Sequence, residues 1–126
     1  MVGIVLVSHS LALAREVAGL ARALAPRAAP VVPVGGLDGT MGAGLDKLRE
    51  AVHAADQGDG VILIADIGSS VLTAKLLVEE LDDDSVVLAD APLVEGAVAA
   101  TVMAGAGAAL PDVRAAAEQA LTTGKL

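Results

Sequence analysis

The 126-residue sequence contains no cysteine and no phenylalanine, tyrosine or tryptophan. Without cysteine the chain can form neither a disulfide framework nor a thiolate zinc site. Without aromatic rings it has no side chains on which bases or flat cofactors stack, which argues against a flavin site and against single-stranded nucleic acid. Basic residues are also scarce, since eight Lys and Arg stand against sixteen Asp and Glu. The net charge of −8 argues against nucleic-acid partners in general.

Neither apolar stretch of the sequence has the features of a signal peptide or a membrane span. The apolar N-terminus lacks a preceding basic region and is interrupted by Arg15 and Glu16. Residues 93–110 carry Glu95 as their only charge, but they are rich in Ala and Gly and fall short of the roughly 20 apolar residues that a span needs. We therefore expect a cytoplasmic protein without a membrane partner, and its length predicts one domain over residues 1–126.

Strand-like and helix-like segments alternate four times along the chain. Apolar runs typical of buried parallel strands occupy residues 2–7, 31–34, 61–65 and 85–89. After the first run, Ser10 is suited to cap a helix that extends to about Ala25. Its apolar stripe consists of Leu13, Val17, Leu20 and Leu24. The alternation predicts an α/β fold with an open parallel sheet of about four strands and helices on both faces.

The later helices are marked by their apolar residues and by the turns between them. Leu45, Leu48 and Val52 mark the second helix, which follows a glycine-rich loop over residues 35–42. The third carries the apolar positions Val71, Ala74, Val78 and Leu81, and the acidic residues 82–84 are placed outside it as a solvated turn. A small-residue helix after residue 96 fades near Gly105, and a last helix is predicted from Pro111 to about Thr122.

Two polar segments follow strands that the predicted topology makes neighbours. In the strand order 2-1-3-4 the order reverses between strands 1 and 3, and ligands of such sheets bind outside the carboxyl ends of the strands at that point. Ser8-His9-Ser10 follows the first strand, and Asp66-Ile67-Gly68-Ser69-Ser70 follows the third. We therefore predict that His9 and Asp66 meet beside a Gly-Ser-Ser helix start, flanked by the glycine-rich loop and by residues 92–96.

Each part of this constellation has a chemical use. Asp66 can accept a hydrogen bond from one ring nitrogen of His9, which fixes the tautomer and leaves the other nitrogen as a nucleophile. Backbone amides and two hydroxyls at the helix start form an anion site. This combination suggests phosphoryl transfer through a transient phosphohistidine. The predicted catalytic residues are His9 and Asp66, and the predicted phosphate-binding residues are Ser10, Gly36, Gly68, Ser69 and Ser70.

Simpler interpretations stand beside this one. His9 fits a polar turn that merely starts a helix, Asp66 fits a helix cap, and Gly-Ser turns before helices are common. Other site types lack their motifs, because the sequence has no G-x-x-x-x-G-K-[ST], no G-x-G-x-x-G directly after the first strand and no G-x-S-x-G. His53 is expected on an exposed face away from His9, so we predict no metal site and no bound cofactor.

Three segments carry a resemblance to a known family. They are Gly3-Ile4-Val5-Leu6-Val7-Ser8-His9-Ser10, Asp66-Ile67-Gly68-Ser69 and Ala91-Pro92-Leu93-Val94-Glu95-Gly96. In their order and spacing the chain resembles the phosphotransferase subunits of bacterial dihydroxyacetone kinases, which are relatives of the mannose-type enzyme IIA domains of the sugar phosphotransferase system. In mannose-type sugar transporters the histidine is typically followed by Gly, so Ser10 and the sequence of residues 91–96 favour the dihydroxyacetone branch. The likeness covers essentially the whole chain.

The resemblance implies a flavodoxin-like fold and a phosphoryl relay. By position, His9 would be phosphorylated by the phosphocarrier protein HPr, which is charged from phosphoenolpyruvate through enzyme I. The phosphoryl group would then pass to ADP on the nucleotide-binding subunit of the kinase, and from there to dihydroxyacetone on the substrate-binding subunit. Mannose-type relatives imply a homodimer. Longer relatives append carrier and enzyme I-like domains, so this chain is expected to need separate upstream partners.

The start of the second helix departs from the family pattern. Relatives often show Leu-Gly-Thr-Ser where this chain has Met41-Gly42-Ala43-Gly44, which removes two hydroxyls. The backbone amides and the single hydroxyl of Thr40 are the groups that remain for phosphate contact there.

Other functions remain as alternatives to this relay. The first alternative is a mannose-type component of a sugar transporter. The second is a regulatory module that binds a partner only when His9 is phosphorylated, and the third is a small-ligand-binding domain without chemistry.

Overall fold

The computed structural model describes residues 1–37 and 41–126. In this part of the chain, strands and helices follow one another in the predicted alternation. Their bounds are β1 (Gly3–Val7), α1 (Leu11–Leu24), β2 (Val31–Val34), α2 (Met41–Ala55), β3 (Val61–Ala65), α3 (Gly68–Leu81), β4 (Val86–Leu88), α4 (Leu93–Gly105) and α5 (Leu110–Gln119). Each strand lies within one residue of its predicted position.

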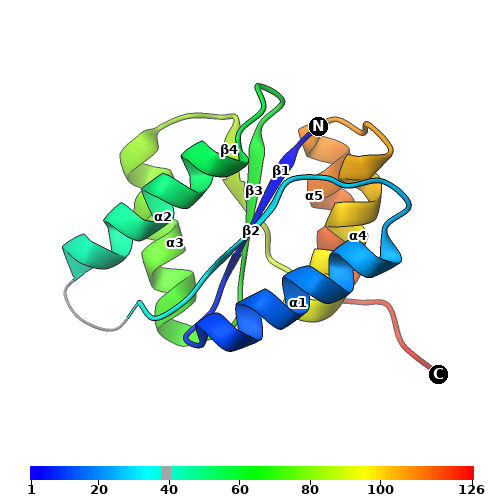
Figure 1. The fold of residues 1–126 in the computed structure, drawn as a ribbon, viewed down its shortest axis with the longest axis horizontal. Coiled ribbons are helices and arrows are strands. Elements are labelled where there is room, and N and C mark those ends of the chain that lie inside the picture. Colours follow the sequence, from blue (N-terminus) through cyan, green and yellow to red (C-terminus); the bar gives the residue numbers. More distant parts are fainter. Residues whose placement is uncertain (38–40) are drawn as a thin grey trace.

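The four strands form one parallel sheet in the order β2-β1-β3-β4, so the predicted fold class and strand order are confirmed. Helices α1, α4 and α5 cover one face of the sheet, and α2 and α3 cover the other (Figure 1). The strand order reverses between β1 and β3, because the chain moves from β1 to one edge and then returns to the other side. No helix within residues 1–37 and 41–126 combines the length and apolar character needed to cross a membrane.

The sheet separates two apolar cores because side chains alternate along each strand. On β1, Ile4 and Leu6 face the core under α1, α4 and α5, whereas Val5 and Val7 face the core under α2 and α3. The same alternation places Ile62 and Ile64 of β3 in the first core. Both central strands are buried along their full length, as expected of a sheet covered on both sides.

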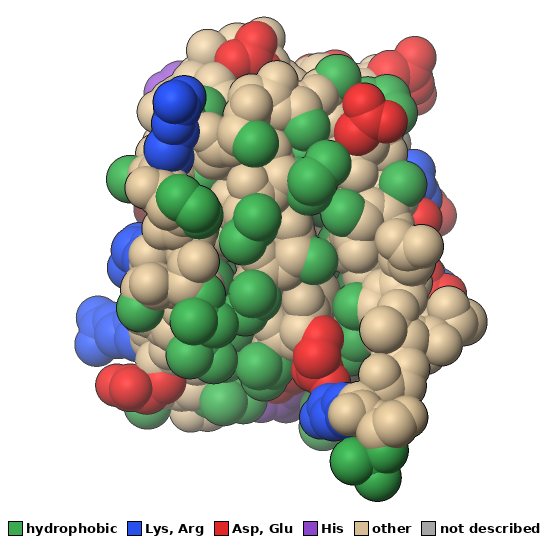
Figure 2. Space-filling view, turned by 90° about the vertical axis from the view of Figure 1, so that its right-hand side faces the viewer, with side chains coloured by type: hydrophobic (Ala, Val, Ile, Leu, Met, Phe, Trp, Pro, Cys, Tyr) green, Lys and Arg blue, Asp and Glu red, His purple; other side chains and the backbone are tan. Residues whose placement is uncertain are grey.

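The stripe predicted on α1 does not face the core, and this prediction is wrong for three of its four residues. Leu13, Leu20 and Leu24 are exposed, and only Val17 is buried. The buried side of α1 consists of small residues together with that valine, namely Ala14, Val17, Ala18 and Ala21. Small side chains let α1 approach α4, whose own buried residues are mostly Gly and Ala. The leucines are therefore left exposed on α1. Hydrophobic side chains are also gathered on the face of the molecule that Figure 2 shows.

Several helix boundaries differ from the prediction. Helix α2 already begins at Met41, inside the segment predicted as a glycine-rich loop, and Thr40 lies outside the described residues. Helix α5 begins at Leu110 and ends at Gln119, three residues before the predicted end at Thr122. Helix α3 ends as predicted, with Asp82 as its C-cap in the left-handed conformation and the acidic turn exposed.

A stability prediction follows from the contact between Gly3 at the start of β1 and Ala55 at the end of α2. A Cβ atom on Gly3 would overlap the Ala55 carbonyl group, which belongs to backbone that cannot rotate away. We expect Gly3→Ala to lower the free energy of unfolding by about 1–3 kcal/mol, measured by urea denaturation. The matched control is Gly19→Ala on the exposed side of α1, where the space is open and the better helix former should raise stability by roughly 0.5–1 kcal/mol. Equal effects of both substitutions would contradict the prediction.

Candidate functional site

Strand register brings the two predicted polar segments together. Val7, the last residue of β1, pairs with Ala65, the last residue of β3. Ser8 and Asp66 therefore leave the sheet side by side. Two backbone hydrogen bonds continue the pairing beyond the strands, from Ser8 N to Val34 O at 2.9 Å and from Asp66 N to Val7 O at 3.0 Å. The backbone on both sides of the site is thus fixed by the sheet.

The side chains of His9 and Asp66 are in direct contact. His9 Nδ1 lies 3.2 Å from Asp66 Oδ1 and 3.4 Å from Oδ2, and the His9 backbone amide donates to Oδ2 at 3.0 Å. The ring is about half exposed, with 47% of the His9 side chain accessible, whereas Asp66 is 12% accessible. The carboxylate is therefore held beneath an imidazole that a second molecule can reach.

The contact with Asp66 determines which ring nitrogen is available. An ionised carboxylate only accepts hydrogen bonds, so the proton of neutral His9 is on Nδ1 and the lone pair is on Nε2. Ser69 Oγ lies 2.5 Å from Nε2 and donates to that lone pair, while Ser70 Oγ lies 3.1 Å from Nδ1. The nitrogen with the free lone pair is thus Nε2, and the Ser69 hydroxyl covers it.

Asp66 stays ionised despite its burial. Burial by itself raises the pKa of Asp66, but hydrogen bonds from the Ile67 and His9 amides and from the Ser70 and Ser8 hydroxyls outweigh it and hold the pKa well below its usual range. The Ile67 amide is 2.7 Å from Oδ1, and Ser8 Oγ is 2.9 Å from Oδ2. A permanent negative charge therefore lies beside the imidazole at every physiological pH.

Ser8 is a site residue that the sequence prediction missed. It is fully buried, donates its hydroxyl hydrogen to Asp66 and accepts the Ser10 amide at 3.0 Å. Its position immediately before His9 at the end of a strand was the available signal. Ser8 thereby links the loop after β1 to the carboxylate after β3.

The start of α3 offers free amides close to Nε2. The N-cap residue is Ile67, and no described side chain caps this helix end, whereas Ser10 caps α1 by accepting the Leu13 amide. The amides of Gly68 and Ser69 find no acceptor among the described residues. Gly68 has φ +44°, which a residue without Cβ adopts most easily. Asp66 accepts the amide of the next residue and does not act as the cap that the simpler interpretation assigns to it.

Two predicted phosphate-binding residues use their polar groups within the protein. Ser10 accepts the Leu13 amide at 3.2 Å, and its own amide is bound by Ser8. The Gly36 amide donates to the His9 carbonyl at 3.4 Å. In this arrangement Ser10 and Gly36 position the loop that carries His9, whereas the amides of Gly68 and Ser69 have no acceptor within residues 1–37 and 41–126. Phosphate contacts by all of these residues stay predictions.

The site therefore combines an imidazole nitrogen with a free lone pair, a fixed negative charge and a helix end whose amides are able to bind an anion. These are the parts required to take a phosphoryl group onto Nε2 and to neutralise its oxygens. His53, predicted to be ordinary surface, is exposed on α2 and makes no part of the site. The described part of the chain holds no cluster of three or more His, Asp and Glu side chains that could bind a metal ion.

A family model and several curated relatives match this chain. The model for the PTS system fructose IIA component matches residues 3–114. The "PEP-dependent dihydroxyacetone kinase, phosphoryl donor subunit DhaM" of Providencia stuartii is 34% identical, with 96% of this chain and 27% of that protein covered. The "PTS-dependent dihydroxyacetone kinase, phosphotransferase subunit DhaM" of Lactococcus lactis is 31% identical, with 94% of this chain and 95% of that protein covered. The chain thus spans about a quarter of the longer relative and nearly all of the shorter one.

A solved structure shares the whole fold. The crystal structure of a protein of unknown function superposes with a TM-score of 0.76 at 27% identity and covers 100% of both chains. The likeness therefore extends over every element described above, including the loops that carry His9 and Asp66.

Proposed function

This chain belongs to the PTS fructose IIA component family, with DhaM subunits as its relatives, and on that premise we propose that it is the phosphoryl donor subunit of a PEP-dependent dihydroxyacetone kinase. In this proposal residues 1–126 act as one mannose-type enzyme IIA domain and His9 carries the phosphoryl group in transit. The contact of Nδ1 with the Asp66 carboxylate carries the proposal, because it leaves the lone pair on Nε2, which lies against the Ser69 hydroxyl at the start of α3.

In the first step, phosphorylated HPr donates to His9. The Nε2 lone pair forms a bond to phosphorus, while the bond between phosphorus and the donor breaks and its electron pair stays with the donor. Nδ1 keeps its proton, so the ring acquires positive charge, which the adjacent Asp66 carboxylate stabilises. Ser69 releases Nε2 and donates to a phosphoryl oxygen beside the amides of Gly68 and Ser69.

In the second step, the phosphoryl group leaves for ADP held on the nucleotide-binding subunit of the kinase. A terminal phosphate oxygen of ADP forms the new bond to phosphorus, and the electron pair of the breaking N–P bond returns to Nε2. No proton needs to move in either direction, because Nδ1 remains protonated throughout. Dihydroxyacetone is then phosphorylated on the substrate-binding subunit, away from this chain.

We further propose that the protein acts in the cytoplasm, forms a homodimer and needs neither a metal ion nor a bound cofactor, since the transient phosphohistidine is its only intermediate. Half-exposure of the His9 ring supports a relay between proteins, because both partners must bring their reacting atoms to Nε2.

Reconstitution tests this function. We expect phosphoenolpyruvate, enzyme I and HPr to place label on the chain, and the labelled chain to convert ADP on the nucleotide-binding subunit to ATP. The readout is chromatographic detection of labelled ATP and of dihydroxyacetone phosphate once the third subunit is added. Transfer of the label instead to the IIB domain of a sugar permease identifies a transport component. A labelled chain that binds a partner without passing on phosphate identifies a regulatory module.

A further inference from the structure

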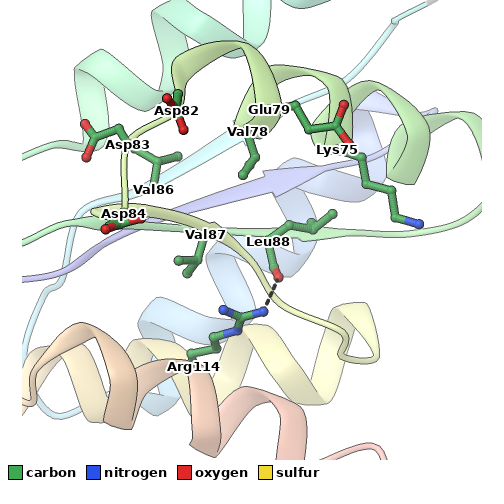
Figure 3. A pocket seen from close by; sticks show the side chains of 10 residues that line it. All are labelled: Lys75, Val78, Glu79, Asp82, Asp83, Asp84, Val86, Val87, Leu88 and Arg114. Carbon is green, nitrogen blue, oxygen red and sulfur yellow. Dashed lines mark hydrogen bonds between the residues drawn. The ribbon is translucent and has the colours of Figure 1, made fainter.

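A cleft of about 380 Å³ adjoins the site on the side of β4. Its lining includes Asp66 of the site, Asp90 after β4 and Lys75 of α3. Lys75 and Leu88 also line a second cleft of about 690 Å³, which extends along β4 to the acidic turn at residues 82–84 (Figure 3). The two clefts therefore adjoin at Lys75 and Leu88 beside the edge strand β4, and Asp66 lines the smaller one.

Lys75 is the cationic side chain that lines the cleft beside Asp66. Its amine extends away from Asp82, Asp83 and Asp84 (Figure 3). It makes no hydrogen bond or salt bridge to any residue in the described part of the chain. By contrast, five other basic side chains are bonded to carbonyl or carboxylate oxygens: Arg22, Lys47, Arg49, Arg114 and Lys125. Lys75 thus places a positive charge, which no described residue pairs with, in the cleft that Asp66 also lines.

The charge of the whole chain makes this cation important for an anionic partner. The net charge is −8, and Asp66 and Asp90 add negative charge to the cleft itself. In the proposed function, the phosphoryl group on Nε2 accepts hydrogen bonds from the Ser69 hydroxyl and from the amides at the start of α3. A nucleoside diphosphate brings two further phosphates of its own, and these need a positive charge outside the cradle at His9.

We propose that Lys75 is a positioning residue for the second transfer, in which it contacts the phosphates of a nucleoside diphosphate carried by the partner protein. This inference rests on the proposed function. The donor brings only the phosphoryl group that it transfers, whereas the acceptor brings additional charge. Lys75 therefore favours discharge of the phosphohistidine to the nucleotide and has little effect on its formation.

The two half-reactions are measured separately to test this role. In the first, phosphorylated HPr labels the chain, and in the second, the labelled chain discharges to the ADP-loaded nucleotide-binding subunit at several ionic strengths. We expect Lys75→Ala to raise the KM for the acceptor complex roughly fivefold to tenfold with little change in kcat, and to weaken the dependence on salt. Lys75→Glu should act more strongly, Lys75→Arg should restore most of the rate, and labelling should change less than about twofold.

The control is Arg27→Ala, which removes one positive charge from an exposed residue beyond the end of α1, at the opposite edge of the sheet. It should leave both half-reactions unchanged. Discharge of Lys75→Ala at the wild-type rate overturns the role of Lys75, and an equal loss in both half-reactions overturns its specificity for the acceptor. If wild-type protein labelled on His9 does not discharge to ADP at all, the proposed function fails, and the role of Lys75 fails with it.

Discussion

Replacement of His9 by alanine is expected to abolish phosphoryl labelling of the chain by phosphoenolpyruvate, enzyme I and HPr. In the proposed mechanism Nε2 of His9 is the nucleophile, and the other side chains that the described residues place beside Asp66 and His9 are serine hydroxyls, which are far weaker nucleophiles. The loss should exceed a factor of about 10³, because covalent transfer without its nucleophile has no alternative route. Radiolabelled phosphoenolpyruvate followed by gel autoradiography measures it.

The matched control is His53→Ala, which removes the second histidine of the sequence from an exposed position on α2. This variant should accept label at the wild-type rate, and the label on both proteins should be lost in acid and kept in base, as is typical of phosphohistidine. His9 is half exposed, so its replacement should leave the fold intact, and circular dichroism checks this. Undiminished labelling of His9→Ala would rule out the phosphohistidine proposed here.

The second large effect is expected from Asp66→Asn. Its amide can present a hydrogen-bond donor to Nδ1, which favours the tautomer with a proton on Nε2 and removes the lone pair that attacks phosphorus. The substitution also removes the negative charge that stabilises the positively charged phosphorylated ring. We expect the rate of labelling to fall by roughly 10²- to 10⁴-fold, as in other sites where a carboxylate orients a reactive imidazole. Rapid-quench kinetics with phosphorylated HPr measures the change.

A loss of structure must be separated from a loss of chemistry for this variant. Asp66 accepts hydrogen bonds from the Ser8 hydroxyl and from the His9 and Ile67 amides, so asparagine should also lower stability by about 1–3 kcal/mol. Urea denaturation measures this second effect, and kinetics are compared where both proteins are folded. Asp112→Asn on the first turn of α5 provides the same charge change at a distance. A folded Asp66→Asn protein that accepts phosphate as fast as wild type would exclude Asp66 from the mechanism.

The sheet and the contact between His9 and Asp66 were predictable, because both follow from the order of apolar runs and polar segments along the sequence. Buried parallel strands read as continuous apolar runs, and their alternation with helices leaves few topologies. The register of Val7 with Ala65 then makes the contact between the segments after β1 and β3 a consequence of the strand order. The family resemblance drawn from those same segments is confirmed by the family model and the DhaM relatives.

The features that sequence reasoning missed depend on distances between elements. The leucines of α1 match the period of a helix, but Ala14, Ala18 and Ala21 match it as well, and the close approach of α1 to α4 selects the smaller set. The hydroxyl of Ser8 and the direction of the Lys75 amine depend on side-chain rotamers that no periodicity encodes. The pattern of residue types placed Met41 in the glycine-rich loop, because Gly42 and Gly44 lower the helical propensity of the first turn of α2, whereas the family resemblance placed residues 41–44 at the start of that helix.

The hydrogen bond between Ser69 and Nε2 has a consequence for the energetics of the proposed relay. In the resting protein the hydroxyl satisfies the ring nitrogen, and after phosphorylation it can satisfy a phosphoryl oxygen at the same place. The number of hydrogen bonds that Ser69 makes then changes little between the two states. In the proposed relay this hydroxyl therefore favours neither state strongly, and the transfer potential of the phosphoryl group stays in its bond to nitrogen.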